Sequence, residues 1–114
     1  IMAVYVSNIV IEQGFDFETT FELENSLTNE PLDLSSYDLP DSKLRKSYSS
    51  SKSYDFETRF VDELAGKFLI SMGSSITSQL KPGRYVYDVK LTTGGGLTSK
   101  AVEGSVIVRG GVTK

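Results

Sequence analysis

The sequence of 114 residues contains no cysteine, no histidine and no tryptophan, and only three prolines. Without cysteine there is no disulfide, and without histidine there is no Ser-His-Asp or Cys-His arrangement for nucleophilic catalysis. The side chains that most often hold zinc, and the one that most readily transfers protons near neutral pH, are therefore missing together. These absences predict a protein that is not an enzyme and that needs neither a cofactor nor a metal.

The charge balance excludes further functions. Twelve Lys and Arg residues stand against 15 Asp and Glu residues, for a formal net charge of −3, so the broad basic surface of a nucleic-acid-binding protein is not expected. No apolar run approaches the ~20 residues that a membrane-spanning helix needs. The first residues lack the charged leader and the cleavage site of a secretory signal. We therefore expect synthesis in the cytoplasm, no membrane insertion and no nucleic-acid partner.

Apolar and polar residues alternate with a period of two, as they do in strands with one buried face. The segment 14–24 is the clearest case, with an apolar face and an acidic face. Its apolar positions are Phe15, Phe17, Phe21 and Leu23. Its polar positions are Asp16, Glu18, Thr20, Glu22 and Glu24. The alternation predicts a half-buried strand.

Further strands are expected at 3–11, 39–48, 54–60, 67–72, 84–92 and 101–108. Leu44 is the clearest inward residue of the segment 39–48, and Phe68, Ile70 and Met72 share the inward face of 67–72. Turn residues separate the strands, and only the segment 73–79 is expected to form a short helical turn. About seven strands at this spacing are typical of an all-β, antiparallel, Greek-key sandwich. The length predicts a single domain over residues 1–114.

The segment LKPGRY at 80–85 carries the most specific local motif. A leucine, then Pro82-Gly83, then a tyrosine that enters a strand is typical of the tyrosine corner of Greek-key sandwiches, in which the tyrosine hydroxyl bonds to the backbone a few residues upstream. Proline fixes φ and glycine permits the tight turn. We therefore expect structural roles for Leu80, Pro82, Gly83 and Tyr85, and we expect Tyr87 to fill the space between the two sheets.

The acidic ladder of 14–24 has three interpretations. Clustered carboxylates bind Ca²⁺, and a carboxylate pair across a cleft hydrolyses glycosidic bonds. A solvated strand face explains the same alternation more simply, and its charges discourage pairing with another edge. We expect this third interpretation to hold.

One short basic cluster, Lys43, Arg45 and Lys46, stands close to Tyr48. These four residues are the candidates for a docking patch, and a solvated strand edge is the alternative interpretation. The serine-rich segment 47–53 is expected to be a loop that connects two strands, with an interaction tip as the alternative. Glycines 94–96 lack the frame of a phosphate-binding loop and predict a hairpin turn.

Several segments, taken in order, resemble a family of small immunoglobulin-like modules encoded by tailed bacteriophages, especially marine contractile-tailed cyanophages. The matching segments are GFDF at 14–17, Phe21, PLDLSSY at 31–37, LRKSYSSS at 44–51, YDF at 54–56, LKPGRYVYDV at 80–89, VEG at 102–104 and GVT at 111–113. The resemblance implies a virion structural protein or tail accessory module with a β-sandwich fold. It offers no catalytic residue to carry over to this chain.

Two functions follow as hypotheses. In the first, the protein is a virion component of the tail, baseplate, neck or capsid surface, and it binds other virion proteins through a sheet edge or face. The Val- and Ile-rich segment 3–11 could also pair with a second copy of the chain. In the second, the protein binds a carbohydrate on the host surface, with Tyr5, Tyr37 and Tyr48 as the tyrosines available for contact.

Overall fold

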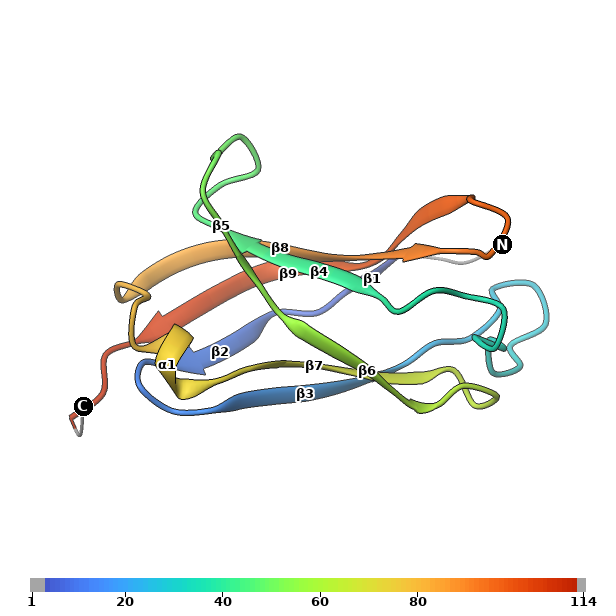
Figure 1. Cartoon of the computed structure of the whole chain (residues 1–114), viewed down its shortest axis with the longest axis horizontal. Helices are drawn as coiled ribbons and strands as arrows, with labels where there is room; N and C mark the ends of the chain where they lie inside the picture. The colour runs from blue at the N-terminus through green and yellow to red at the C-terminus, as the bar shows by residue number, and fades with distance from the viewer. Residues whose placement is uncertain (1–3, 113–114) are drawn as a thin grey trace.

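Two β-sheets packed face to face, with one short helix, make up the fold in the computed structural model, which describes residues 4–112 (Figure 1). The larger sheet contains β1 (Tyr5–Val6), β2 (Ile9–Glu12), β4 (Asp41–Arg45), β5 (Ser53–Asp55), β8 (Gly83–Thr92) and β9 (Thr98–Arg109). The smaller sheet contains β3 (Phe17–Glu22), β6 (Glu57–Asp62) and β7 (Lys67–Met72). The helix α1 (Ser74–Thr77) lies in the segment where a helical turn is expected.

The order of the strands is β5-β4-β8-β9 in the larger sheet, with β1 and β2 following one another along the far side of β9. The smaller sheet has the order β3-β7-β6. The chain passes from one sheet to the other after β2, β3, β5 and β7. This alternation between sheets is the Greek-key sandwich that the sequence predicts.

The segment predicted as one strand over 3–11 forms two strands instead, and Ala3 lies outside the described residues. Both β1 and β2 pair with β9 in parallel, so the larger sheet is not purely antiparallel. The strand is interrupted at Ser7 and Asn8, where a backbone carbonyl and a side-chain oxygen form hydrogen bonds outside the regular strand pairing. The Ser7 carbonyl accepts a hydrogen bond from Tyr87 Oη, and Asn8 Oδ1 accepts one from the Ser105 amide.

The strand predicted over 14–24 is shorter than expected. β3 begins at Phe17, and Phe15 is 49% exposed, so its assignment to the buried face was wrong. The amide of Phe15 donates to the Glu12 carbonyl across a turn in which Gly14 has a φ of 85°. Phe15 shares the parity of the buried face, but it belongs to the turn rather than to the strand.

One predicted strand, 54–60, divides between the two sheets. β5 pairs with β4 in the larger sheet, and β6 pairs with β7 in the smaller sheet. Phe56 lies at the crossing, and its amide donates to the Ser42 carbonyl. Because the side-chain alternation continues through the crossing, the period alone could not reveal it.

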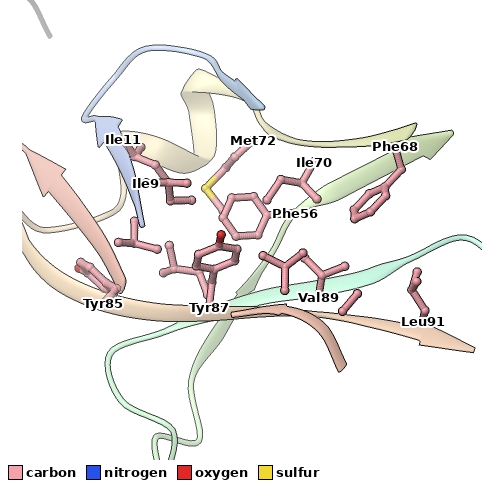
Figure 2. Close-up of a cluster of buried hydrophobic side chains, with 14 of the residues drawn as sticks. Ile9, Ile11, Phe56, Phe68, Ile70, Met72, Tyr85, Tyr87, Val89 and Leu91 are labelled. Carbon is pink, nitrogen blue, oxygen red and sulfur yellow. The ribbon is translucent and has the colours of Figure 1, made fainter. Parts of the chain in front are cut away.

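The core fills the space between the sheets (Figure 2). Tyr87 projects from β8 toward Phe56, and their rings meet edge to face with centroids 6.2 Å apart. Ile70 and Met72 reach the same space from the smaller sheet, while Leu44 is fully buried as expected. Leu69 was expected on the outer face of 67–72, yet it too is buried, because β7 is the central strand of the smaller sheet.

Candidate functional site

The tyrosine corner of segment 80–85 has the geometry that the sequence predicts. Tyr85 Oη donates a hydrogen bond of 2.8 Å to the Lys81 carbonyl, four residues upstream. Leu80 is fully buried beneath the corner, and Gly83 adopts a φ of 145°. Burial raises the pKa of the Tyr85 hydroxyl. The corner thus satisfies a backbone carbonyl that lies outside the strand ladder.

Tyr87 lies two residues further on and connects distant parts of the chain. Its side chain is 1% exposed, and its hydroxyl donates a hydrogen bond of 2.6 Å to the Ser7 carbonyl. Burial raises the pKa of this hydroxyl as well. Tyr87 fills the space between the sheets, as expected, but no sequence pattern indicates its hydrogen-bond partner, which lies 80 residues away.

The structure keeps three of the four residues proposed as one docking patch together, around a hollow that Lys43, Arg45 and Tyr48 line, and separates Lys46 from them. Lys43 and Arg45 lie on the outer face of the larger sheet, because they alternate with the buried Ser42 and Leu44 along β4. Lys46 has the opposite parity, and its ammonium lies 4.6 Å from the centroid of the Tyr85 ring. Lys46 therefore does not belong to one patch with Lys43 and Arg45, and the role of the other three residues stays a prediction.

A shallow depression, which we call the polar groove, runs over β4, β8 and the start of β9. It has a volume of about 330 Å³. Its lining residues are Asp41, Lys43, Arg45, Asp88, Val89, Lys90, Thr98, Ser99 and Lys100. A smaller hollow of about 270 Å³ continues from it past Lys43 and Arg45 to Val86 and Tyr48. Tyr48 is 61% exposed at this rim.

All three lysines that line the polar groove are paired with carboxylates. Lys43 Nζ lies 2.6 Å from Asp55 Oδ1, and this hydrogen bond raises the pKa of the Lys43 ammonium. Lys100 Nζ lies 3.1 Å from Glu103 Oε1 and 3.8 Å from Asp88 Oδ2, and the bond to Glu103 raises its pKa too.

The remaining basic groups of the groove also have partners. Lys90 Nζ lies 3.7 Å from Asp41 Oδ2, and the Arg45 guanidinium donates to the Ser50 carbonyl at 2.6 Å. The groove therefore presents interleaved charges of both signs rather than a basic surface.

Sequence reasoning missed the half of the groove that β8 and β9 supply. Asp88, Lys90 and Lys100 were not singled out as candidates. The alternation that places Tyr85 and Tyr87 inward also places Asp88 and Lys90 outward, so a signal for these two was present. Their position opposite β4 depends on the pairing of β4 with β8, which the pattern does not specify.

The acidic ladder lies on the outer face of the smaller sheet, where Glu18 and Glu22 are exposed. Within residues 4–112, no group of three or more acidic side chains comes close enough together to hold a metal ion. Asp16 has a structural contact instead, since its Oδ1 accepts a hydrogen bond of 2.7 Å from the Ser74 amide at the start of α1.

Among residues 4–112, no helix is long and apolar enough to cross a membrane.

The other candidate segments have simpler places in the fold. Glycines 94–96 lie in the hairpin turn between β8 and β9, which the hydrogen bond from the Thr93 amide to the Leu97 carbonyl closes. The serine-rich segment forms the loop between β4 and β5 and projects beyond the sheet (Figure 1). Tyr37 packs against the core and is partly buried, whereas Tyr5 and Val6 in β1 are exposed.

No protein-family model matches the sequence, and no curated protein sequence matches it. Solved structures do resemble the fold. A mutant of the SrpA adhesin of Streptococcus sanguinis superposes with a TM-score of 0.54 over 90% of this chain, at 11% identity. The fold is an immunoglobulin-like β-sandwich.

This chain covers 54% of that adhesin chain, or about half of its length. Murine CRIg is also similar, with a TM-score of 0.42, 12% identity, and coverage of 91% of this chain and 92% of that chain. An internalin-like protein of Listeria monocytogenes has a TM-score of 0.38 at 15% identity, covering 91% of this chain and 27% of that chain. At 11% identity the likeness to the adhesin establishes the fold alone.

Proposed function

We propose that this chain is a non-enzymatic structural or accessory module of a tailed-phage particle, and that it binds another particle protein through the polar groove. The groove itself is the observation that carries the proposal. It offers charges of both signs on a sheet face, beside the exposed Tyr48. The assignment to a phage particle rests on the resemblance of the sequence segments, above all LKPGRYVYDV at 80–89.

The chemistry of the groove favours a protein as the ligand. Interleaved charges select a partner of complementary pattern and suppress wrong partners, because like charges in contact are costly. Exposed aromatic residues beside such a surface supply contact area, and tyrosine is enriched among the residues that dominate binding energy. Immunoglobulin-like domains are typical of adhesion and protein-interaction modules.

The proposal is tested with purified particles of the phage that encodes the protein. Cross-linking followed by mass spectrometry should join residues of the polar groove to one neighbouring particle protein. A variant with Lys43→Glu and Arg45→Glu should be depleted from particles, because it reverses two charges of the groove. The matched control, Arg59→Glu with Lys67→Glu, makes the same change on the smaller sheet and should be incorporated normally.

Two results would contradict the proposal. The protein could be found free in infected-cell lysate and missing from purified particles. Alternatively, the groove variant and its control could be incorporated equally well, in which case the groove does not make the contact.

Tyr48 also supports a second candidate function, the binding of a host-surface carbohydrate. Exposed aromatic side chains provide stacking surfaces for sugars, and Tyr48 is 61% exposed at the rim of the smaller hollow. A glycan array that shows selective binding, abolished by Tyr48→Ala, would favour this function over the first. An array without signal would end it.

A further inference from the structure

A second basic feature, which we call the lysine pocket, lies where the β4–β5 loop meets the loop before β8. It is a hollow of about 230 Å³. Its lining residues are Lys46, Ser50, Lys52, Tyr54, Gln79, Lys81 and Tyr85. None of these residues lines the polar groove. The pocket contains three lysines and no acidic side chain.

The lysines of this pocket differ from those of the polar groove in their partners. Lys46 Nζ lies 4.6 Å from the centroid of the Tyr85 ring, and Lys52 Nζ lies 5.3 Å from that of Tyr54. Within residues 4–112, none of Lys46, Lys52 and Lys81 forms an ion pair with a carboxylate. The carboxylates of the described residues therefore do not neutralise the positive charge of the lysine pocket.

The tyrosine rings position the ammonium groups without neutralising their charge. A ring face attracts a cation through its quadrupole, and an ammonium that lies over a ring still has N–H donors directed elsewhere. The Tyr85 ring is itself held by the corner hydrogen bond to the Lys81 carbonyl. The same bond fixes the backbone of Lys81, so two of the three cations depend on one rigid element.

Gly83 provides the space that Lys46 occupies. A Cβ at this position would lie 3.0 Å from Lys46 Nζ, and its φ of 145° is one that side-chain-bearing residues rarely adopt. The glycine of the corner motif therefore serves the turn and also allows the ammonium to reach the Tyr85 ring.

From this geometry we infer that the lysine pocket binds an acidic segment of a partner protein, with one or two Asp or Glu side chains entering between the ammonium groups. Uncompensated lysines attract carboxylates, and association between complementary charges is fast and selective. Lysine is a compact point charge, which suits a single carboxylate. The pocket is separate from the polar groove, so the inference does not depend on the function proposed for that groove.

The surroundings of the pocket favour a short acidic segment over a nucleic acid. A nucleic acid needs a continuous basic track along its phosphates. Glu57 is exposed three residues after Tyr54, and the whole chain carries a net charge of −3. These charges would repel a long polyanion beyond the pocket, whereas a carboxylate side chain inserted into the hollow does not need to extend past it.

The test uses a fluorescein-labelled oligoglutamate peptide, with the corresponding oligoglutamine peptide as a control, and measures binding by fluorescence anisotropy at low salt. The oligoglutamate should bind and the oligoglutamine should not. The variant Lys46→Gln with Lys52→Gln should weaken binding by about tenfold or more. The matched variant Lys43→Gln with Lys100→Gln removes the same charge from the polar groove and should change binding by less than about twofold.

Lys81→Gln provides a second variant, with an exposed side chain outside any strand, should the double variant fail to fold. When the oligoglutamate peptide is titrated in an NMR experiment, the amide chemical shifts of Tyr54 and Tyr85 should change and those of β3 should not.

Three outcomes would overturn the inference. Equal weakening by the two double variants would mean that the affinity for the peptide depends on the net charge of the protein and not on the lysine pocket. Tighter binding of an oligonucleotide than of the oligoglutamate would assign the pocket to a nucleic acid. Self-association in sedimentation experiments that Lys52→Gln abolishes would place a second copy of the chain in the pocket instead of a different protein.

Discussion

Gly104 in β9 provides a direct test of how the N-terminal strands are held. The backbone of Ser7 passes so close to it that an added Cβ would overlap the Ser7 carbonyl oxygen and lie 2.8 Å from the Ser7 carbonyl carbon. The same Cβ would lie 3.1 Å from Asn8 Oδ1. Backbone atoms block this position rather than a flexible side chain, so Gly104→Ala forces the segment between β1 and β2 away from β9.

The cost of this displacement follows from the hydrogen bonds that it breaks. Tyr87 Oη loses the Ser7 carbonyl while remaining buried, which costs about 1–3 kcal/mol. The bond of 3.0 Å from the Ser105 amide to Asn8 Oδ1 is exposed, and a typical bond contributes about 0.5–1.5 kcal/mol. Alanine recovers roughly 0.5–1 kcal/mol over glycine inside a strand. We therefore expect Gly104→Ala to lower the free energy of unfolding by about 2 kcal/mol.

Urea unfolding followed by far-UV circular dichroism measures this change. The matched control is Gly95→Ala in the β8–β9 turn, where the new Cβ would have only Thr93 Oγ1 nearby, at 3.8 Å. This control should change the free energy of unfolding by less than about 0.5 kcal/mol. Tyr87→Phe should cost about 1–3 kcal/mol in the wild-type chain, and should cost nothing or recover stability in the Gly104→Ala background, because there it removes a buried hydroxyl that has already lost its partner.

Two outcomes would refute the reasoning. If Gly104→Ala unfolds at the wild-type urea concentration, the Ser7 carbonyl does not lie against Gly104. If Tyr87→Phe costs the same free energy in both backgrounds, the two residues do not act through one hydrogen bond, and the N-terminal segment is held by other contacts.

Three further predictions concern the core and the corner. Tyr85→Phe removes the corner hydrogen bond and should lower the free energy of unfolding by about 1–3 kcal/mol, whereas Tyr48→Phe at the surface should leave it unchanged; equal values would remove the corner from the account. Burial raises the pKa of both Tyr85 and Tyr87, so the folded state retains protons that the unfolded chain releases, and stability should be complete below about pH 10 and fall above it. Urea midpoints at about pH 9 and about pH 11 should differ less in Tyr87→Phe than in the wild type, and identical differences would contradict this. Leu44→Ala should cost about 2–5 kcal/mol in the same unfolding assay, while Leu39→Ala at an exposed position should cost less than about 0.5 kcal/mol; a small loss at Leu44 would mean that the core collapses around the gap.

Features that depend on neighbouring residues were predictable from the sequence. The tyrosine corner is the best example, because Tyr85 and the carbonyl that it bonds are four residues apart. The turn chemistry of Pro82 and Gly83 lies between them, so the sequence contains all the parts of the motif. The inward position of Leu44 is equally local, since it follows from alternation along a single strand.

Features that depend on where the chain leaves a strand were not predictable in the same way. Phe15 and Phe56 both keep the parity of a buried strand residue, but Phe15 lies in a turn and Phe56 lies at the crossing between sheets. Alternation reports only which side of an extended chain is apolar. It does not report with which strand the chain pairs, so an extended crossing and a continuous strand give the same pattern.

Pairing between strands also decides which charges are available to a partner. Lys43, Arg45 and Lys46 form one cluster in the sequence, but alternation sends the first two to the outer face and the third to the end of the sheet. On the outer face, the strand register places Asp55 of β5 directly opposite Lys43, and the two side chains form an ion pair. Lys46 lies near the Tyr85 ring instead of a carboxylate. Two lysines three positions apart thus differ in their surroundings, because Lys43 lies in an ion pair on the outer face of the sheet and Lys46 has no carboxylate partner among residues 4–112.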